Sequence, residues 1–135
     1  WLTMSYYNIN DFINACSKEP KNVIPIGNVL RDASEDFNLR TKFDLLKFIS
    51  NEGLEELQFV NTKNWEKKPD KNNPIKVDAY KFRTMDRLGY IAFFYNEKTN
   101  KWIIKSFHLS DDRNPAMMIA LQKAGLLPLE DKNEK

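Results

Sequence analysis

Hydrophobic residues in the first part of the chain recur with the spacing of amphipathic helices. Residues 8–18 carry apolar side chains at positions i, i+3, i+4 and i+7, which share one face of a helix. The same spacing predicts a short helix over residues 26–33 and a third helix over residues 37–50. The apolar positions of the three helices are Ile9, Phe12, Ile13 and Cys16; Ile26, Val29, Leu30 and Ala33; and Leu39, Phe43, Leu46 and Ile49. Packing of these faces would place the Cys16 thiol in the core.

The second half of the chain has the patterns of β-strands. Strands are predicted over residues 75–83, 88–95 and 101–108, and residues 54–60 are either a strand or the end of the helical part. Residues 88–95 are apolar on both alternations, which predicts a central strand covered on both faces. The polar turn at residues 96–100 makes the last two strands antiparallel neighbours. Alternation in the last strand places Trp102, Ile104 and Ser106 on one face and Ile103, Lys105 and Phe107 on the other.

The remaining segments are polar. Residues 61–74 are charged and contain proline, which predicts an exposed loop, and Trp65 within it either pins the loop onto the core or contacts a partner. Asn114 and Pro115 predict the start of a last short helix, and residues 129–135 predict a frayed tail. The sequence therefore predicts a single α+β domain over residues 1–135. Its N-terminal helices pack on a C-terminal antiparallel sheet of three to four strands, followed by a short terminal helix.

Composition narrows the classes of function. With one cysteine and one histidine, the chain cannot form an internal disulfide, and a cysteine-based or two-histidine metal site is not expected. Four glycines and no glycine-rich phosphate loop argue against a nucleotide cofactor, so no cofactor is expected. No apolar run is long enough to span a bilayer and no signal-peptide pattern opens the chain, so we expect a cytoplasmic protein without a membrane partner. The net charge of +2 neither demands nor excludes a nucleic-acid partner.

His108 is the candidate general acid or base, because its ordinary pKa lies closest to neutrality. The alternative is a histidine at the sheet edge with no catalytic task. Tyr90 could stack on a base or lend its hydroxyl, or it could be an aromatic residue of the core or rim.

Basic residues cluster in the predicted sheet and could form a cationic patch of the kind that stabilises a phosphodiester transition state. The alternative is that these side chains are only solvated at strand ends. The candidates are Lys81, Arg83, Arg87, Lys105 and Arg113.

Three segments resemble a known family. Residues 79–83 (AYKFR) are similar to a family strand of the form L-W/Y-E-L-R, and residues 90–95 (YIAFFY) to Y-R-V-x-Y-F. Residues 104–115 keep the spacing of L-H-G-F-x-K-K-T-x-K-T-P without a gap. With the order of the predicted elements, these segments resemble the RelE/ParE superfamily, specifically the phage-derived HigB-type toxins. The resemblance spans roughly residues 29–125 and implies ribosome-dependent cleavage of messenger RNA by a toxin that a cognate antitoxin neutralises.

The resemblance assigns residues only where positions match. Arg83 matches the strand arginine of the family, and Arg113 matches the last lysine of the terminal pattern. The sequence departs from the family at its histidine position, which is Lys105, and at its paired lysines, which fall on Leu109 and Ser110.

Two hypotheses of function follow from the sequence. The first is a RelE/HigB-like ribonuclease with Arg83, Lys105, His108 and Arg113 as catalytic residues and Lys81, Arg87 and Tyr90 as RNA-binding residues. The second is a non-enzymatic binding protein, such as a phage- or plasmid-encoded inhibitor or adaptor. It would grip one protein target through the sheet face and the loop around Trp65.

Overall fold

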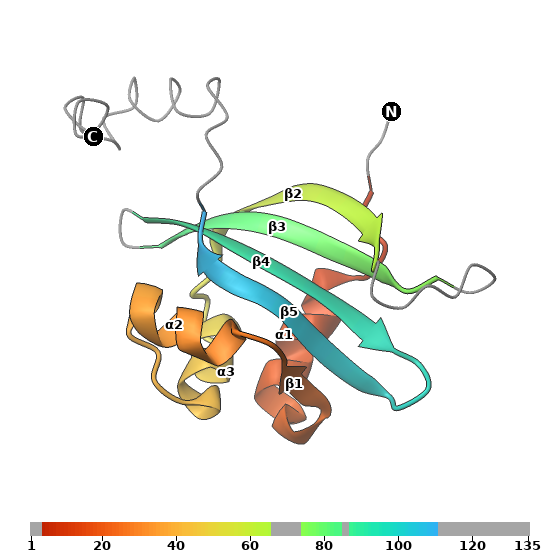
Figure 1. Ribbon diagram of the computed structural model, residues 1–135, viewed down its shortest axis with the longest axis horizontal. Helices are drawn as coiled ribbons and strands as arrows, with labels where there is room; N and C mark the ends of the chain where they lie inside the picture. Colours follow the sequence, from red (N-terminus) through yellow and green to blue (C-terminus); the bar gives the residue numbers. More distant parts are fainter. Residues whose placement is uncertain (1–3, 66–73, 85–86, 111–135) are drawn as a thin grey trace.

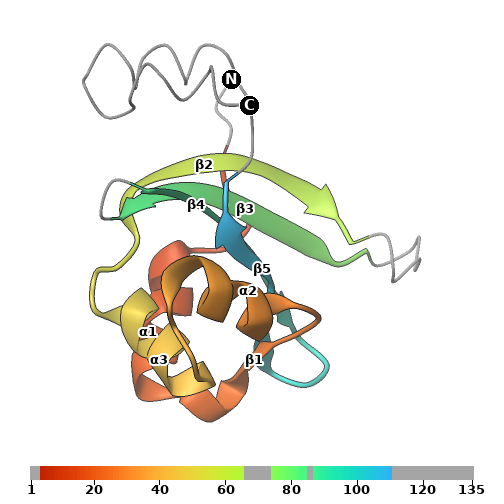
Figure 2. The ribbon, with the colours of Figure 1, turned by 60° about the vertical axis from the view of Figure 1, so that its left-hand side comes forward.

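Three helices lie on one face of a five-stranded sheet (Figures 1 and 2). The computed structural model describes residues 4–65, 74–84 and 87–110. The helices are α1 (Ile9–Lys18), α2 (Val29–Phe37) and α3 (Lys42–Ser50), with a 3₁₀ turn at Pro20–Asn22. The strands are β1 (Val23–Pro25), β2 (Glu55–Asn64), β3 (Lys76–Thr84), β4 (Arg87–Asn96) and β5 (Lys101–Leu109). The predicted α+β class is confirmed, with five strands in place of three to four.

The sheet has the strand order β1-β5-β4-β3-β2, so β4 is the central strand, as predicted. Strands β2 to β5 form an antiparallel meander, and β1 pairs with β5 in parallel. Strand β1 has three residues and was not predicted, because its partner is distant in sequence. The predicted terminal helix at Asn114 and the tail at residues 129–135 lie outside the described residues.

Two predicted boundaries are wrong. The helix predicted over residues 37–50 is the end of α2 followed by all of α3, because Asn38 adopts the left-handed conformation (φ 59°) and closes α2. The Thr41 hydroxyl then accepts a hydrogen bond from the Asp44 backbone N–H at 3.0 Å and starts α3. The loop predicted from residue 61 is also wrong at its start, because residues 61–64 pair with β3.

Aromatic side chains fill the space between the helices and the sheet. The rings of Phe12 and Phe93 stack with centroids 4.2 Å apart, and those of Phe82 and Phe107 lie 5.6 Å apart. Cys16 is buried in this core, as predicted, and burial raises the pKa of its thiol to about 12. Within the part of the chain that the structure describes, no helix is long and apolar enough to cross a membrane.

A β-bulge at Lys105 overturns the predicted alternation of the last strand. Ala92 pairs with Ser106 and Phe93 with Ile104, so Lys105 is an extra residue of β5. Beyond the bulge the faces exchange. Phe107 is buried with Ile104 in the helix-facing core, and Ser106 is on the opposite face.

Candidate ligand-binding face of the sheet

The side of the sheet turned away from the three helices carries most of the predicted site residues, and we call it the open face. One row of cross-strand partners runs across it from β2 to β5. The row consists of Gln58, Lys81, Tyr90 and His108. Directly opposed residues in antiparallel strands have Cβ atoms about 4.5–5.5 Å apart, so these side chains are immediate neighbours.

Two contacts orient the His108 ring at the end of this row. Its ring stacks on Tyr90 with centroids 5.3 Å apart and 21° between the planes. Its Nδ1 lies 2.7 Å from the carbonyl oxygen of Leu109. Because a carbonyl oxygen only accepts, this hydrogen bond needs a proton on Nδ1, which puts the lone pair of the neutral ring on Nε2. A histidine in that form can act as a general base.

Two cations of β3 lie on the same face. Lys81 is buried, with 7% of the residue exposed. Arg83 forms a two-bond ion pair with Glu56, through Nε to Oε1 at 3.0 Å and Nη2 to Oε2. Hydrogen bonding from the guanidinium lowers the pKa of Glu56. Glu56 has a positive φ (50°) and lies where the β2–β3 register shifts, so a bulge positions this carboxylate.

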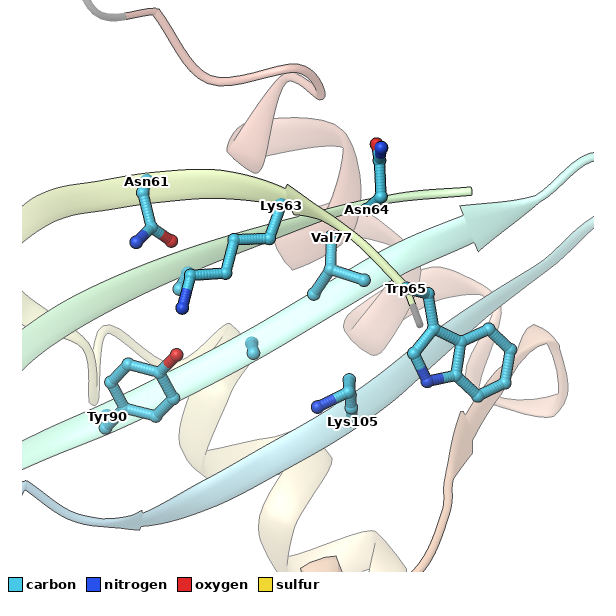
Figure 3. Close-up of a pocket in the computed structure, with 9 residues that line it drawn as sticks. Asn61, Lys63, Asn64, Trp65, Val77, Tyr90 and Lys105 are labelled. Carbon is cyan, nitrogen blue, oxygen red and sulfur yellow. The ribbon is translucent and has the colours of Figure 1, made fainter. Parts of the chain in front are cut away.

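A cavity of about 260 Å³ lies beside the Tyr90 row. Its floor is made by Val77, Ala79 and Ala92 of β3 and β4. Figure 3 shows Tyr90 at one end and Trp65 at the other, with the side chains of Lys63 and Lys105 between them.

Trp65 packs onto the sheet, which agrees with the interpretation that it pins its segment to the core. The centroids of the Trp65 and Phe94 rings lie 4.9 Å apart, and the Trp65 backbone N–H donates to the Ile75 carbonyl oxygen at 2.8 Å. Phe94 is thereby covered on the open face, which explains how the central strand is apolar on both alternations. The rest of the Trp65 side chain lines the cavity.

Most, but not all, predicted site residues come together. Lys81, Arg83, Tyr90, Lys105 and His108 share the open face, and Trp65 closes one end of the cavity.

Arg87 does not join them. It is paired with Thr84, on the helix-facing side, and its guanidinium donates to the carbonyl oxygen of Asp36 near the end of α2. Arg87 therefore completes the C-terminal end of a helix, where a cation is favourable, so its predicted place in the cationic patch is wrong. Arg113 lies outside the described residues.

Three polar residues of the cavity lining escaped the prediction, Asn61, Lys63 and Asn64. All three belong to the segment predicted as a loop. Asn61, Lys63 and Trp65 alternate along it on the cavity side, and Thr62 is directed toward Asp78 on the other side. That period of two was the signal that strand β2 continues.

The described residues contain no group of three or more histidine, cysteine, aspartate or glutamate side chains that could hold a metal ion. Scans of protein-family models, curated proteins and solved structures found no match to this chain.

Proposed function

We propose that this domain is an endoribonuclease of the RelE/HigB type, acting on single-stranded RNA through the open face. The observation that carries the proposal is the arrangement of His108, stacked on Tyr90 with its Nδ1 against the Leu109 carbonyl oxygen, beside cationic side chains. A base next to cations is what cleavage by an internal hydroxyl requires, because a proton must leave and negative charge develops on the phosphate.

The reaction needs no cofactor or water. His108 Nε2 accepts the proton of a ribose 2′-hydroxyl, and the 2′ oxygen forms a bond to the adjacent phosphorus. The bond from phosphorus to the 5′ oxygen breaks, and this oxygen leaves with a proton donated by the Lys105 ammonium group. The products are a 2′,3′-cyclic phosphate and a 5′-hydroxyl. Lys81 and Arg83 stabilise the charge on the phosphate oxygens.

The ion pair between Arg83 and Glu56 bears directly on substrate binding. An incoming phosphate has to compete with the Glu56 carboxylate for the same guanidinium. The resemblance of the sequence supplies the partners of the proposal, which are messenger RNA on the ribosome and a cognate antitoxin. Such a toxin acts in the cytoplasm.

Induced expression in bacteria tests this function. We expect the wild type to arrest growth and cleave transcripts, and His108→Ala to lower the cleavage rate by about 10²–10⁴-fold, the usual contribution of a general base. Arg83→Ala should also abolish cleavage. Arg87→Ala is the control for arginine, because this side chain is directed to α2. Normal growth and intact transcripts with soluble, folded wild type would refute the proposal.

The second candidate is a binding protein that grips one protein target through the open face and Trp65. The ion pair between Arg83 and Glu56 favours this candidate, because it occupies the guanidinium that a catalytic arginine would use to bind the phosphate. This candidate predicts no effect on transcripts and a stable complex that survives His108→Ala but is lost when Lys105 or Trp65 is replaced.

A further inference from the structure

The cavity between Tyr90 and Trp65 adjoins the row that contains His108 and shares Tyr90 with it. We propose that it binds one nucleotide of the RNA next to the cleaved bond. The base lies against the Trp65 indole, and its phosphate lies between Lys63 and Lys105. The inference depends on the proposed function for the identity of the RNA, but it concerns binding and can be tested without cleavage.

Small side chains in one cross-strand row form the cavity. Ala79 and Ala92 are paired directly across β3 and β4, and Asn61 is the partner of Ala79 on β2. Small side chains in this row leave space above the sheet, whereas the rows on either side carry the rings of Tyr90 and Phe94. A cavity of about 260 Å³ remains between aromatic walls.

The charge of the lining selects an anion. Lys63 and Lys105 contribute two ammonium groups, and among the residues that the structure describes no acidic side chain lines the cavity. The nearest carboxylate in the strands of the floor, that of Asp78, is directed to the other side of β3 and is fully buried in hydrogen bonds to Tyr6, Tyr7 and Thr62. The two ammonium groups in the described part of the lining therefore favour a negatively charged ligand.

The size and the lining of the cavity fit a single nucleotide. Its volume of about 260 Å³ is close to the lower end of the range for small-molecule sites, about 300–1,000 Å³. Aromatic side chains next to lysines are the combination that holds single-stranded nucleic acid, with bases stacked on rings and phosphates on cations. Asn61 adds an amide that can donate to and accept from a base edge.

The position of Tyr90 connects the cavity to the proposed catalytic residue. Tyr90 lines the cavity and also stacks on His108. A nucleotide in the cavity is therefore the neighbour of the one whose 2′-hydroxyl faces His108. Lys63 is not part of the proposed chemistry, so its replacement separates nucleotide binding from catalysis.

The experiment measures binding of a labelled single-stranded RNA hexamer to the full chain by fluorescence anisotropy, in a His108→Ala background that does not cut the probe. Trp65→Leu removes the stacking surface and should weaken binding by about 5- to 150-fold, the range for loss of one base stack. Lys63→Gln should weaken binding and reduce the slope of log affinity against log salt by about 0.7, as expected for one lost phosphate contact. Lys98→Gln, in the turn between β4 and β5, is the matched lysine control and should change neither quantity.

Each outcome discriminates between the two proposals. Unchanged binding in both Lys63→Gln and Trp65→Leu would overturn the nucleotide site, even where the wild type cleaves RNA. Weakened binding in both variants, together with a wild type that does not cleave, would support the site and refute the ribonuclease. Absence of RNA binding, or binding of an acidic peptide with the same dependence on Lys63 and Trp65, would also overturn the site. Circular dichroism verifies that Trp65→Leu is folded, and Lys63→Gln provides the test if it is not.

Discussion

Replacement of Asp78 by asparagine is predicted to destabilise the domain, because this carboxylate joins the N-terminal segment to the sheet. Asp78 is fully buried. Its Oδ1 accepts from the Tyr6 backbone N–H at 3.0 Å and from the Thr62 hydroxyl at 2.5 Å, and its Oδ2 accepts from the Tyr7 backbone N–H at 2.8 Å. Asparagine offers one accepting oxygen, so at least one backbone N–H would face the amide NH₂ group, which only donates.

The magnitude follows from the bonds that are lost. A hydrogen bond to a charged group contributes about 1.5–3 kcal/mol, and a donor left without an acceptor in a buried position costs about 1–3 kcal/mol. We therefore expect Asp78→Asn to lower the free energy of unfolding by about 1–3 kcal/mol. Thr62→Val removes one donor to the same carboxylate and should cost a similar amount. The two changes together should cost less than their sum, because they share a bond.

Urea denaturation followed by circular dichroism measures this loss. With a denaturant slope of about 1.5 kcal/mol/M, the midpoint for Asp78→Asn should fall by about 0.7–2 M. Asp11→Asn is the control, because Asp11 is exposed in the first turn of α1 and its charge contributes at most about 1 kcal/mol. A midpoint for Asp78→Asn equal to that of the control would refute the reasoning.

Three further predictions concern the core and the ion pair. Gly89→Ala should lower the free energy of unfolding by about 1–3 kcal/mol in thermal or urea unfolding, because a Cβ atom at this position would lie 2.2 Å from the Phe82 ring; an unchanged midpoint would contradict this contact. Burial raises the pKa of Cys16 to about 12, so an aromatic disulfide reagent at pH 8 should react with it only after denaturation, whereas rapid reaction of the native protein would contradict burial. The bond from Arg83 lowers the pKa of Glu56, so the stabilisation is present above the ordinary glutamate pKa and is lost as the pH falls through the lowered value. A carboxyl NMR titration should show this midpoint returning to the ordinary range in Arg83→Ala.

Local patterns predicted the elements better than their ends. The helical spacing located α1 and α3, and alternation located β3 and β5, because each pattern reflects one buried face. Strand β4 was located by its continuous apolar run, which reflects cover on both faces. The break between α2 and α3 was missed, although Asn38 and Thr41 are residues typical of helix ends. Strand β1 could not be predicted, since three residues carry no periodicity and its pairing with β5 is set by tertiary packing.

The candidate site was predicted only in part, because residue types are read directly from the sequence whereas the register of the strands is not. Lys81, Tyr90 and His108 were identified by residue type, but their meeting in one row depends on register. The bulge at Lys105 exchanges the faces of β5 and brings His108 to the side of Lys105, which strict alternation cannot give. Lys63 was missed because the polar, proline-bearing stretch of residues 61–74 was predicted as a loop, although strand β2 extends to Asn64.

The parallel pairing of β1 with β5 also affects how the protein folds during synthesis. The helices emerge first, but the surface that they cover belongs to strands made later, and the partner of β1 is the last described strand. At a synthesis rate of about 5–20 residues per second, the apolar faces of α1, α2 and α3 remain uncovered for several seconds. Closing a ladder between such distant segments is entropically costly, which places it late in the folding reaction. Nascent chains stalled before β5 should therefore be protease-sensitive and bind chaperones, whereas chains with β5 outside the ribosomal tunnel should be resistant.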